Sequence, residues 1–449
     1  MIQKASVLAI GALLAASVGF PAEFPLEIKR MTLDEALSAP GDSAYAELKT
    51  SKPDAIRKQP KARSERPLYG VLGGADKDGM AFRVDESQGK GKGCDLLIFD
   101  LNRNGDLTDD PVHKRVKNEG GKQGTTESAL VGGGMALFGP IEAPAGGKNA
   151  PRMILYAEVL SFGGLAESLG ISGQMQIKPG CSLETTVDLD GVRQKIALVD
   201  ANGNFRFGDK TEMGLLKMPD GEQLCMPQQM GDTILRDRNG SGKFESDGMN
   251  SEADPWSSVI YFGANPYTLT VTDDLAKVAV EPYSGPMGEL AIQNGARIEA
   301  IMLARETSAD KWEAVVLPGS SAKVKVPVGT YQLLGCQLAG KDGGAVTMAG
   351  GRNNRTKSTA FSVEAGKSAT LKCGPPLQLQ VQAERRAPGL LAAIFAGGSR
   401  AIDINLSVVG AGGEIYNLFR KGDGEADPPK FKILDEQGKE IASGDLEYG

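Results

Sequence analysis

The chain has 449 residues, too many for one ordinary hydrophobic core, and its hydrophobic content of 41% is enough to build two or three domains. A formal net charge of −7 argues against a nucleic-acid-binding protein, because phosphate binding needs a basic face. With 59 glycines, 24 prolines and few long amphipathic periods, the chain is predicted to be mostly β, a multi-domain protein of antiparallel β-sandwich modules.

Residues 1–22 have the pattern of a secretory signal. A charged start is followed by the apolar run 5–20 and by small residues suited to cleavage near Gly19 or Ala22. The run is shorter than the roughly 20 residues of a membrane-spanning helix, and no later apolar segment reaches that length. We therefore expect export to the periplasm or the extracellular space, with no membrane span in the mature chain.

Residues 23–66 are predicted to hold one short helix and a flexible basic linker. Thr32 and Glu35 have the spacing of a capping box, which indicates a helix start. The segment 49–66 is rich in lysine and arginine and has few apolar residues to bury, so we interpret it as a tether.

Residues 67–283 are predicted to form a β domain with three loops rich in Asp and Asn. The predicted strand 95–99 ends at Asp100. A hairpin with its turn at Asp190 and Gly191 leads to Asp200, and the strand 233–236 ends at Asp237. In each case an extended, mostly apolar run presents an aspartate at its end.

The three loops carry oxygen-bearing side chains at positions one, three and five, which is how a short turn wraps calcium. In the first loop the candidate ligands are Asp100, Asn102, Asn104, the carbonyl of Asp106, and Asp109 or Asp110 as the closing carboxylate. In the second they are Asp200, Asn202, Asn204 and Asp209. In the third they are Asp237, Asn239, Ser241 and Asp247, with a carbonyl from Lys243 and a water-mediated contact from Glu245.

Two alternatives to three separate sites remain open. Asp, Asn and Gly favour tight turns whether or not a metal is bound. The second loop has Phe205 where a glycine is expected, and its ligands could instead complete a site shared with the third loop.

These loops resemble the calcium loops of dockerin, thrombospondin type 3 and EF-hand proteins, set here between strands instead of helices. The first and third loops depart from the EF-hand pattern, because an acid stands at position eleven in place of the glutamate at twelve. The runs ALVDANGNFRFGD, GDTILRDRNGSGKF and ILDEQGKEIASGDLEYG are similar to a group of exported bacterial proteins of unassigned activity. The resemblance implies calcium and export, and it implies no substrate.

Beyond residue 283 the alternating segments predict a small β-sandwich over 284–375 and an Ig-like β module over 376–449. Five cysteines are an odd number for an exported protein. Cys336 with Cys373 is the candidate disulfide and Cys181 with Cys225 a weaker one. Buried reduced thiols are the alternative.

The predicted function is that of an exported calcium-binding β protein with a binding or scaffolding role at the cell envelope, partnered by an envelope protein or polysaccharide. A carbohydrate-binding protein is the first alternative, although only Trp256 and Trp312 are tryptophans. A hydrolase using loop carboxylates is the second. His113 is the single histidine, which disfavours a histidine-based zinc site or serine triad, so we lean against an enzyme.

Overall fold

A computed structural model of the chain describes residues 21–38, 44–72, 79–88, 94–116, 135–145, 151–161, 172–217, 223–238, 240–244, 252–293, 298–309, 311–319, 322–339, 345–348, 360–385, 402–416, 418–421 and 424–446. It has two compact units. Unit 1 comprises Met1–Glu212, Pro227–Phe262 and Tyr267–Tyr283, and unit 2 comprises Met213–Met226, Gly263–Pro266 and Ser284–Gly449.

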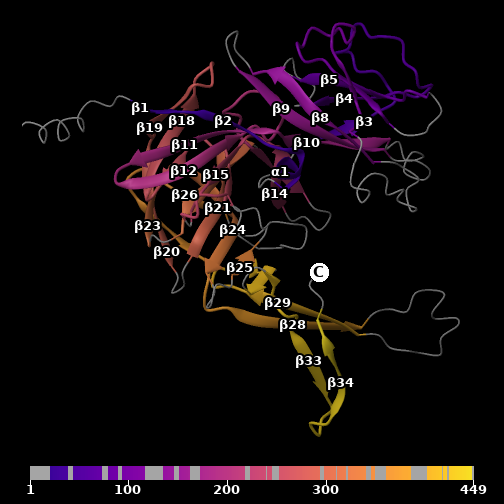
Figure 1. Cartoon of the computed structure of the whole chain (residues 1–449). Coiled ribbons are helices and arrows are strands. Elements are labelled where there is room, and N and C mark those ends of the chain that lie inside the picture. The colour runs from indigo at the N-terminus through magenta and orange to yellow at the C-terminus, as the bar shows by residue number, and fades with distance from the viewer. Residues whose placement is uncertain are drawn as a thin grey trace, which may run out of the picture. The chain divides into compact units, whose positions relative to one another are not determined.

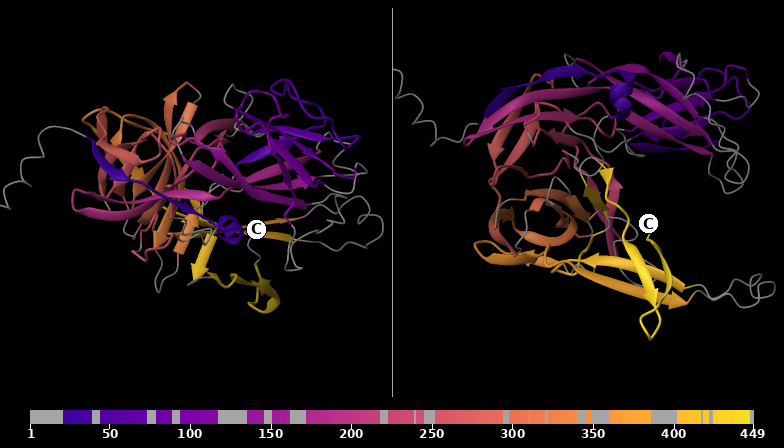
Figure 2. Two further views of the ribbon diagram at one scale, coloured as in Figure 1. Left: turned by 45° about the horizontal axis from the view of Figure 1, so that its top comes forward. Right: turned by 60° about the horizontal axis from the view of Figure 1, so that its bottom comes forward.

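The fold is mostly β, as predicted, and the described residues contain one short helix (Figures 1 and 2). Antiparallel pairing dominates the described sheets, and β20 pairs antiparallel with β23 and parallel with β27. The helix and the strands of the unit 1 sheets are α1 (Leu33–Ser38), β1 (Ala22–Pro25), β2 (Glu27–Arg30), β3 (Tyr45–Leu48), β4 (Leu68–Leu72), β5 (Met80–Asp85), β6 (Leu96–Phe99), β7 (Val112–Lys114), β8 (Met135–Pro144), β9 (Arg152–Ser161), β10 (Gly173–Pro179), β11 (Cys181–Leu189), β12 (Val192–Val199), β15 (Thr233–Arg236), β16 (Ala253–Pro255), β17 (Ile260–Phe262), β18 (Asn265–Val271) and β19 (Lys277–Pro282).

The strands of the unit 2 sheets are β13 (Glu212–Lys217), β14 (Gln223–Gln229), β20 (Met287–Gln293), β21 (Ile298–Ser308), β22 (Lys311–Pro318), β23 (Lys323–Pro327), β24 (Gly329–Ala339), β25 (Ala345–Met348), β26 (Phe361–Val363), β27 (Ser368–Lys372), β28 (Gln378–Arg385), β29 (Ile402–Val409), β30 (Ile415–Tyr416), β31 (Leu418–Lys421), β32 (Gly424–Glu425), β33 (Lys430–Leu434) and β34 (Glu440–Asp445). Among the described residues, no helix is long and apolar enough to cross a membrane.

Unit 1 contains four sheets, with the strand orders β1-β19-β18-β17, β3-β10-β9-β8, β16-β15-β12-β11-β2 and β4-β5-β6-β7. Their inward faces share a large hydrophobic core that includes Phe82, Phe99, Phe138 and Ile196. The capping box predicted for α1 is confirmed, since Glu35 N–H donates to Thr32 Oγ1 and Thr32 N–H donates to Glu35 Oε2. The predicted hairpin between β11 and β12 is confirmed as well, with Asp190 and Gly191 both at positive φ.

Strand β5 is buried on both faces. Phe82 and its alternate neighbours pack into the large core, while Ala81 packs into a second cluster with Ile56, Tyr69 and Ile98. The second cluster therefore needs a cover on the outer face of the β4–β7 sheet.

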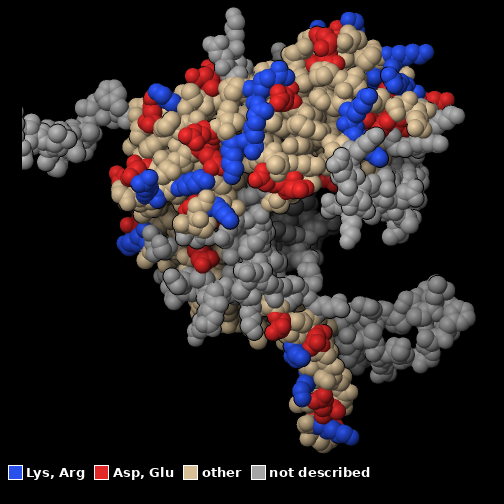
Figure 3. Space-filling model, in the orientation of Figure 1, with Lys and Arg blue, Asp and Glu red and all other residues tan. Residues whose placement is uncertain are grey.

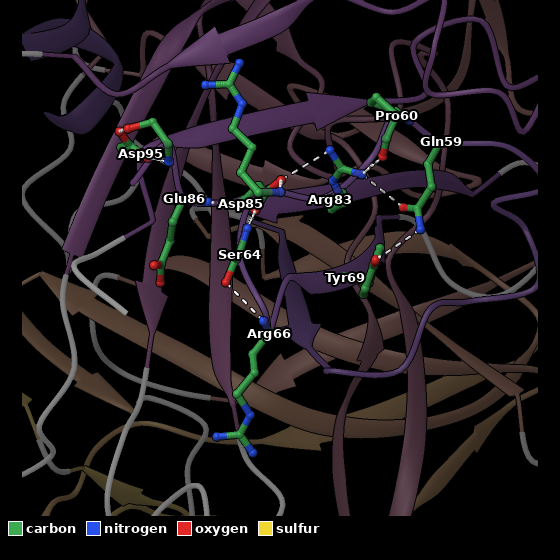
Figure 4. Close-up of polar contacts among 11 residues, drawn as sticks. Gln59, Pro60, Ser64, Arg66, Tyr69, Arg83, Asp85, Glu86 and Asp95 are labelled. Carbon is green, nitrogen blue, oxygen red and sulfur yellow. Dashed lines mark hydrogen bonds and ion pairs between the residues drawn. The ribbon is translucent and has the colours of Figure 1, made fainter. Parts of the chain in front are cut away.

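The cover is the basic segment that the sequence predicts to be a tether, and that prediction is wrong for residues 49–66. Ile56 is fully buried, and Arg63 N–H and Ser64 N–H donate to the Asp85 carboxylate at 3.0 and 2.8 Å. Asp85 also pairs with Arg83 at 3.3 Å, and Arg83 donates to the Pro60 carbonyl at 2.6 Å (Figure 4). One buried isoleucine and one buried ion pair thus order a segment whose composition alone suggests disorder.

Unit 2 departs from the predicted module boundaries. β13, which the sequence places in the domain 67–283, lies beside β22 in the large sheet of unit 2. β31, from the predicted module 376–449, pairs with β25 of the predicted module 284–375, with Val346 opposite Phe419. The described parts of 284–449 therefore form one unit.

The five cysteines are free in the structure. Cys336 and Cys373 are nevertheless buried neighbours whose thiols share a hydrogen bond. Cys181 accepts a hydrogen bond from Ile154 N–H at 3.2 Å and has no disulfide partner. Among the predicted pairs, the structure brings together only the sulfurs of Cys336 and Cys373.

Candidate metal-binding loops

The three Asp/Asn-rich loops start where β6, β12 and β15 end, and all belong to unit 1. They share one backbone conformation, because positions four and six have positive φ in each loop. The values are 55° and 73° at Arg103 and Gly105, 69° and 60° at Gly203 and Phe205, and 74° and 78° at Gly240 and Gly242. A non-glycine residue in this region is strained. Phe205 accepts that conformation while its ring is buried in the large core.

The aspartate at position one anchors each turn. Asp100 accepts hydrogen bonds from Asn104 N–H at 3.0 Å and Gly105 N–H at 2.8 Å. Asp200 accepts the equivalent bonds from Asn204 N–H at 3.1 Å and Phe205 N–H at 2.6 Å. In the third loop Asp237 accepts from Gly242 N–H at 2.8 Å. The turn is therefore built the same way three times.

In the first loop the asparagine side chains converge on Asp109. The amide nitrogens of Asn102 and Asn104 lie 3.4 and 2.8 Å from Asp109 Oδ2. Asn104 N–H bonds to Asn102 Oδ1 as well as to Asp100, so the side chains at positions one, three, five and ten surround one small volume.

The second loop repeats this arrangement with Asp209 at position ten. The Asn202 amide nitrogen lies 3.0 Å from Asp209 Oδ2, and the Asn204 amide donates to the same oxygen. The sequence pattern places an acid at position eleven in the first and third loops. The described geometry instead repeats an acid at position ten, in the first and second loops. Asp110, at position eleven, instead accepts a bond from Leu101 N–H at 3.1 Å through Oδ1.

The remaining acids of the first loop differ in their surroundings. Asp106 forms an ion pair with Lys58 at 2.8 Å, which with hydrogen bonds from Thr108 lowers its pKa to about 2. The pKa of Asp110 is raised to about 6, mainly because burial penalises the charged form and also because Asp100, Asp109 and Asp106 are negative neighbours. Asp110 Oδ2 is buried without a hydrogen-bond partner.

A buried acid that the sequence did not single out, Asp232, lies under the second loop. It is fully buried, and its Oδ2 accepts Gly208 N–H at 2.7 Å and Asp209 N–H at 2.9 Å, while Oδ1 has no partner. Burial and the charges of Asp200 and Asp209 raise its pKa, and burial raises that of Asp200 to about 7. Only tertiary structure brings Asp232 here, since it precedes β15, 23 residues after Asp209.

The third loop is described only in part. Asp237 Oδ1 is buried without a partner, and Lys243 N–H lies 3.3 Å from Ser241 Oγ. The Lys195 ammonium donates to the Gly242 carbonyl at 3.2 Å. The predicted ligands Asn239, Glu245 and Asp247 lie outside the described residues.

A site shared by the second and third loops is excluded by strand register. β12 and β15 are antiparallel, with Val199 opposite Thr233, whereas Asp237 N–H bonds to the Lys195 carbonyl. The two loops thus leave opposite ends of this strand pair, separated by roughly 16 Å of extended chain. The second loop instead neighbours the first, because the Arg103 guanidinium donates to the Asn204 carbonyl.

Within the described residues, no three or more His, Cys, Asp or Glu side chains are grouped so as to hold a metal ion. In the first and second loops the asparagine amides point Nδ2 at the closing aspartate, while Oδ1 accepts a backbone N–H. An ion there would need these amides to turn so that Oδ1 faces it, together with carbonyl and carboxylate oxygens, a donor set that suits calcium.

Comparison of the chain with protein-family models, with curated proteins and with solved structures found no match.

Proposed function

We propose that the protein is an exported calcium-binding β protein with a binding or scaffolding role at the cell envelope. The observation that carries the proposal is the repeated arrangement of the first and second loops, in which Asp, Asn, Asn and Asp side chains at positions one, three, five and ten surround the same small volume. The third loop is included because it shares the backbone conformation and the anchoring aspartate.

The residues present fit a hard cation. Among the described residues of the three loop regions, Asp110, Asp232 and Asp237 each have a buried carboxylate oxygen without a hydrogen-bond partner. An unpaired buried carboxylate is costly, and the raised pKa values of Asp110 and Asp232, both caused mainly by burial, reflect that cost. When bound, calcium would neutralise these acids and cross-link the loop, which is a structural contribution to the surrounding sheets.

The carbohydrate-binding alternative receives less support. Trp256 is 2% exposed and Trp312 is 7% exposed, so neither ring offers the open aromatic face on which sugars stack. We therefore favour a calcium-stabilised module that binds an envelope partner through another surface.

Calorimetry with added calcium, magnesium or chelator tests the proposal. One site occupied at about 100 times its dissociation constant adds about 2.7 kcal/mol to the folded state, or about 5 to 11 °C in melting temperature for a unit of this size. Asp109→Asn and Asp209→Asn should each remove most of one site's contribution. Asp435→Asn is the matched control, because Asp435 forms a similar turn, accepting Gln437 N–H and Lys439 N–H, without converging asparagines.

The proposal fails if elemental analysis finds no bound calcium and the melting profile is identical in calcium and in chelator. The envelope role has a separate readout, which is calcium-dependent retention of the chain by an isolated envelope fraction. Retention that persists in chelator would contradict a calcium-organised binding surface while leaving calcium stabilisation intact.

A further inference from the structure

An open hollow of about 860 Å³ lies on the outer face of the β4–β7 sheet, and all its lining residues belong to unit 1. A volume of this size is in the range of about 300 to 1,000 Å³ that small-molecule sites occupy. Its walls come from the sheet and from the basic segment that crosses it.

Strand register places apolar and charged side chains side by side on the floor of the hollow. On its outer face the sheet presents two rows across β5, β6 and β7, because Ile98 stands opposite Arg83 and Val112, and Leu96 stands opposite Asp85 and Lys114. Ile98, Leu96 and Val112 all line the hollow, and Val112 is 52% exposed. Ile98 and Leu96 are 2% and 7% exposed, so Val112 supplies the open apolar surface, which favours a ligand with an apolar part beside it.

Two charged residues beside this floor, Arg83 and Asp85, are already paired within the protein. Arg83 and Asp85 are both 2% exposed and pair with each other, and Asp85 also accepts two backbone N–H groups from the crossing segment (Figure 4). Their charges therefore offset each other and do not select a ligand.

The rim carries an excess of exposed cations. Lys61, Arg63, Lys114 and Arg115 line the hollow with their side chains exposed, and none of the four forms an ion pair with another described residue. The other acids of the lining are Glu86 and Asp95, and Asp95 already accepts Ser87 N–H at 2.6 Å. By contrast, acidic and basic side chains lie interspersed on the face of the molecule in Figure 3.

We propose that this hollow binds a small amphipathic organic anion, with its apolar part against the exposed Val112 and its acidic group held by Arg63 and Lys114. Charge complementarity selects the anion, since four free cations face two acids in the lining. Guanidinium groups pair with carboxylates and sulfonates through parallel hydrogen bonds, which gives orientation as well as attraction. This inference does not depend on calcium binding.

Fluorescence titration of the full chain with 8-anilinonaphthalene-1-sulfonate, an amphipathic anion, tests the proposal. We expect one saturable site. The double variant Arg63→Gln/Lys114→Gln should raise the dissociation constant about tenfold, and Val112→Asp should abolish binding. All three positions are exposed, so we expect these variants to keep the fold. The control is Arg152→Gln/Lys277→Gln, which removes two exposed cations elsewhere in unit 1 and should leave the dissociation constant unchanged.

N-phenyl-1-naphthylamine, which lacks the sulfonate, separates charge from apolar burial and should bind at least tenfold more weakly than the sulfonate probe. Melting temperatures of all variants within a few degrees of the parent establish that they fold. Equal affinity for the two probes, or an unchanged dissociation constant in the Arg63→Gln/Lys114→Gln variant, would overturn the proposal.

Discussion

His113 shows how one residue's surroundings set a measurable property of the protein. It lies on β7 opposite Leu97, and its partly buried ring has an Nε2 atom without a hydrogen-bond partner. Burial lowers the pKa of His113 below its ordinary value, because the charged form is penalised. Its neighbours Val112 and Lys114 point to the opposite face, toward the hollow.

The sign of the resulting pH dependence follows directly. Because the unfolded chain binds a proton on this histidine more readily than the folded chain, stability is lost as pH falls from the unfolded value near 6.5 through the lowered folded value. His113→Gln should flatten that part of the stability curve between about pH 7 and 5. Urea denaturation of both proteins across this range measures it, and parallel curves for the two would contradict the assignment.

At the scale of the element, the first loop depends on glycine for two separate reasons. Gly105 has a φ of 73°, and a Cβ there would stand 2.7 Å from the Ala55 carbonyl oxygen. Gly191, in the β11–β12 turn, has a φ of 80°, and a Cβ added there would have no heavy atom within 4 Å. Gly191→Ala should therefore cost only the conformational strain of about 1 to 2 kcal/mol, and Gly105→Ala should cost clearly more. Equal losses in denaturation free energy would show that the crossing segment does not press on this loop.

The segment 49–66, which covers the outer face of the β4–β7 sheet, gives a second prediction at this scale. Ile56→Ala should destabilise unit 1 by about 2 to 5 kcal/mol, as for other buried isoleucines. In a solvated tether the same change would have almost no effect. Ile441→Ala, at a position 63% exposed on β34, is the comparison and should change little. If chemical denaturation shows a small effect at both positions, the segment 49–66 is a flexible tether after all.

Local sequence was informative where local chemistry decides the structure. The capping box of α1, the Asp190-Gly191 hairpin and the strand before each loop follow from propensity, turn residues and alternation. Asp232 and the packing of residues 49–66 could not be predicted, because both arise from contacts between segments distant in sequence. Phe205 misled for the same reason, since core burial of its ring accompanies a backbone conformation that favours glycine.

For the molecule as a whole, the oxidation state of the buried thiols of Cys336 and Cys373 depends on whether the compartment is oxidising or reducing. Cys336 and Cys373 are 2% and 0% exposed, and their hydrogen-bonded sulfurs come from strand β24 and from the residue after β27. If the chain is exported, we expect them to be oxidised to a disulfide during folding, closing a loop that stabilises by about 3 to 4 kcal/mol. Non-reducing peptide mapping of the native exported protein checks this. Two thiols that alkylate after unfolding without reductant would contradict it.

The contact between Arg103 and the Asn204 carbonyl carries a consequence for occupancy. The side chain of position four in one loop holds the backbone of position five in the other. If both loops bind calcium as proposed, we expect a shift of either turn to move its neighbour. Any coupling of this kind must be reciprocal, with each ion changing the affinity for the other by the same factor. The titration of the pair would then deviate from two independent sites, and Arg103→Ala, which removes this hydrogen bond, should bring it closer to a simple sum.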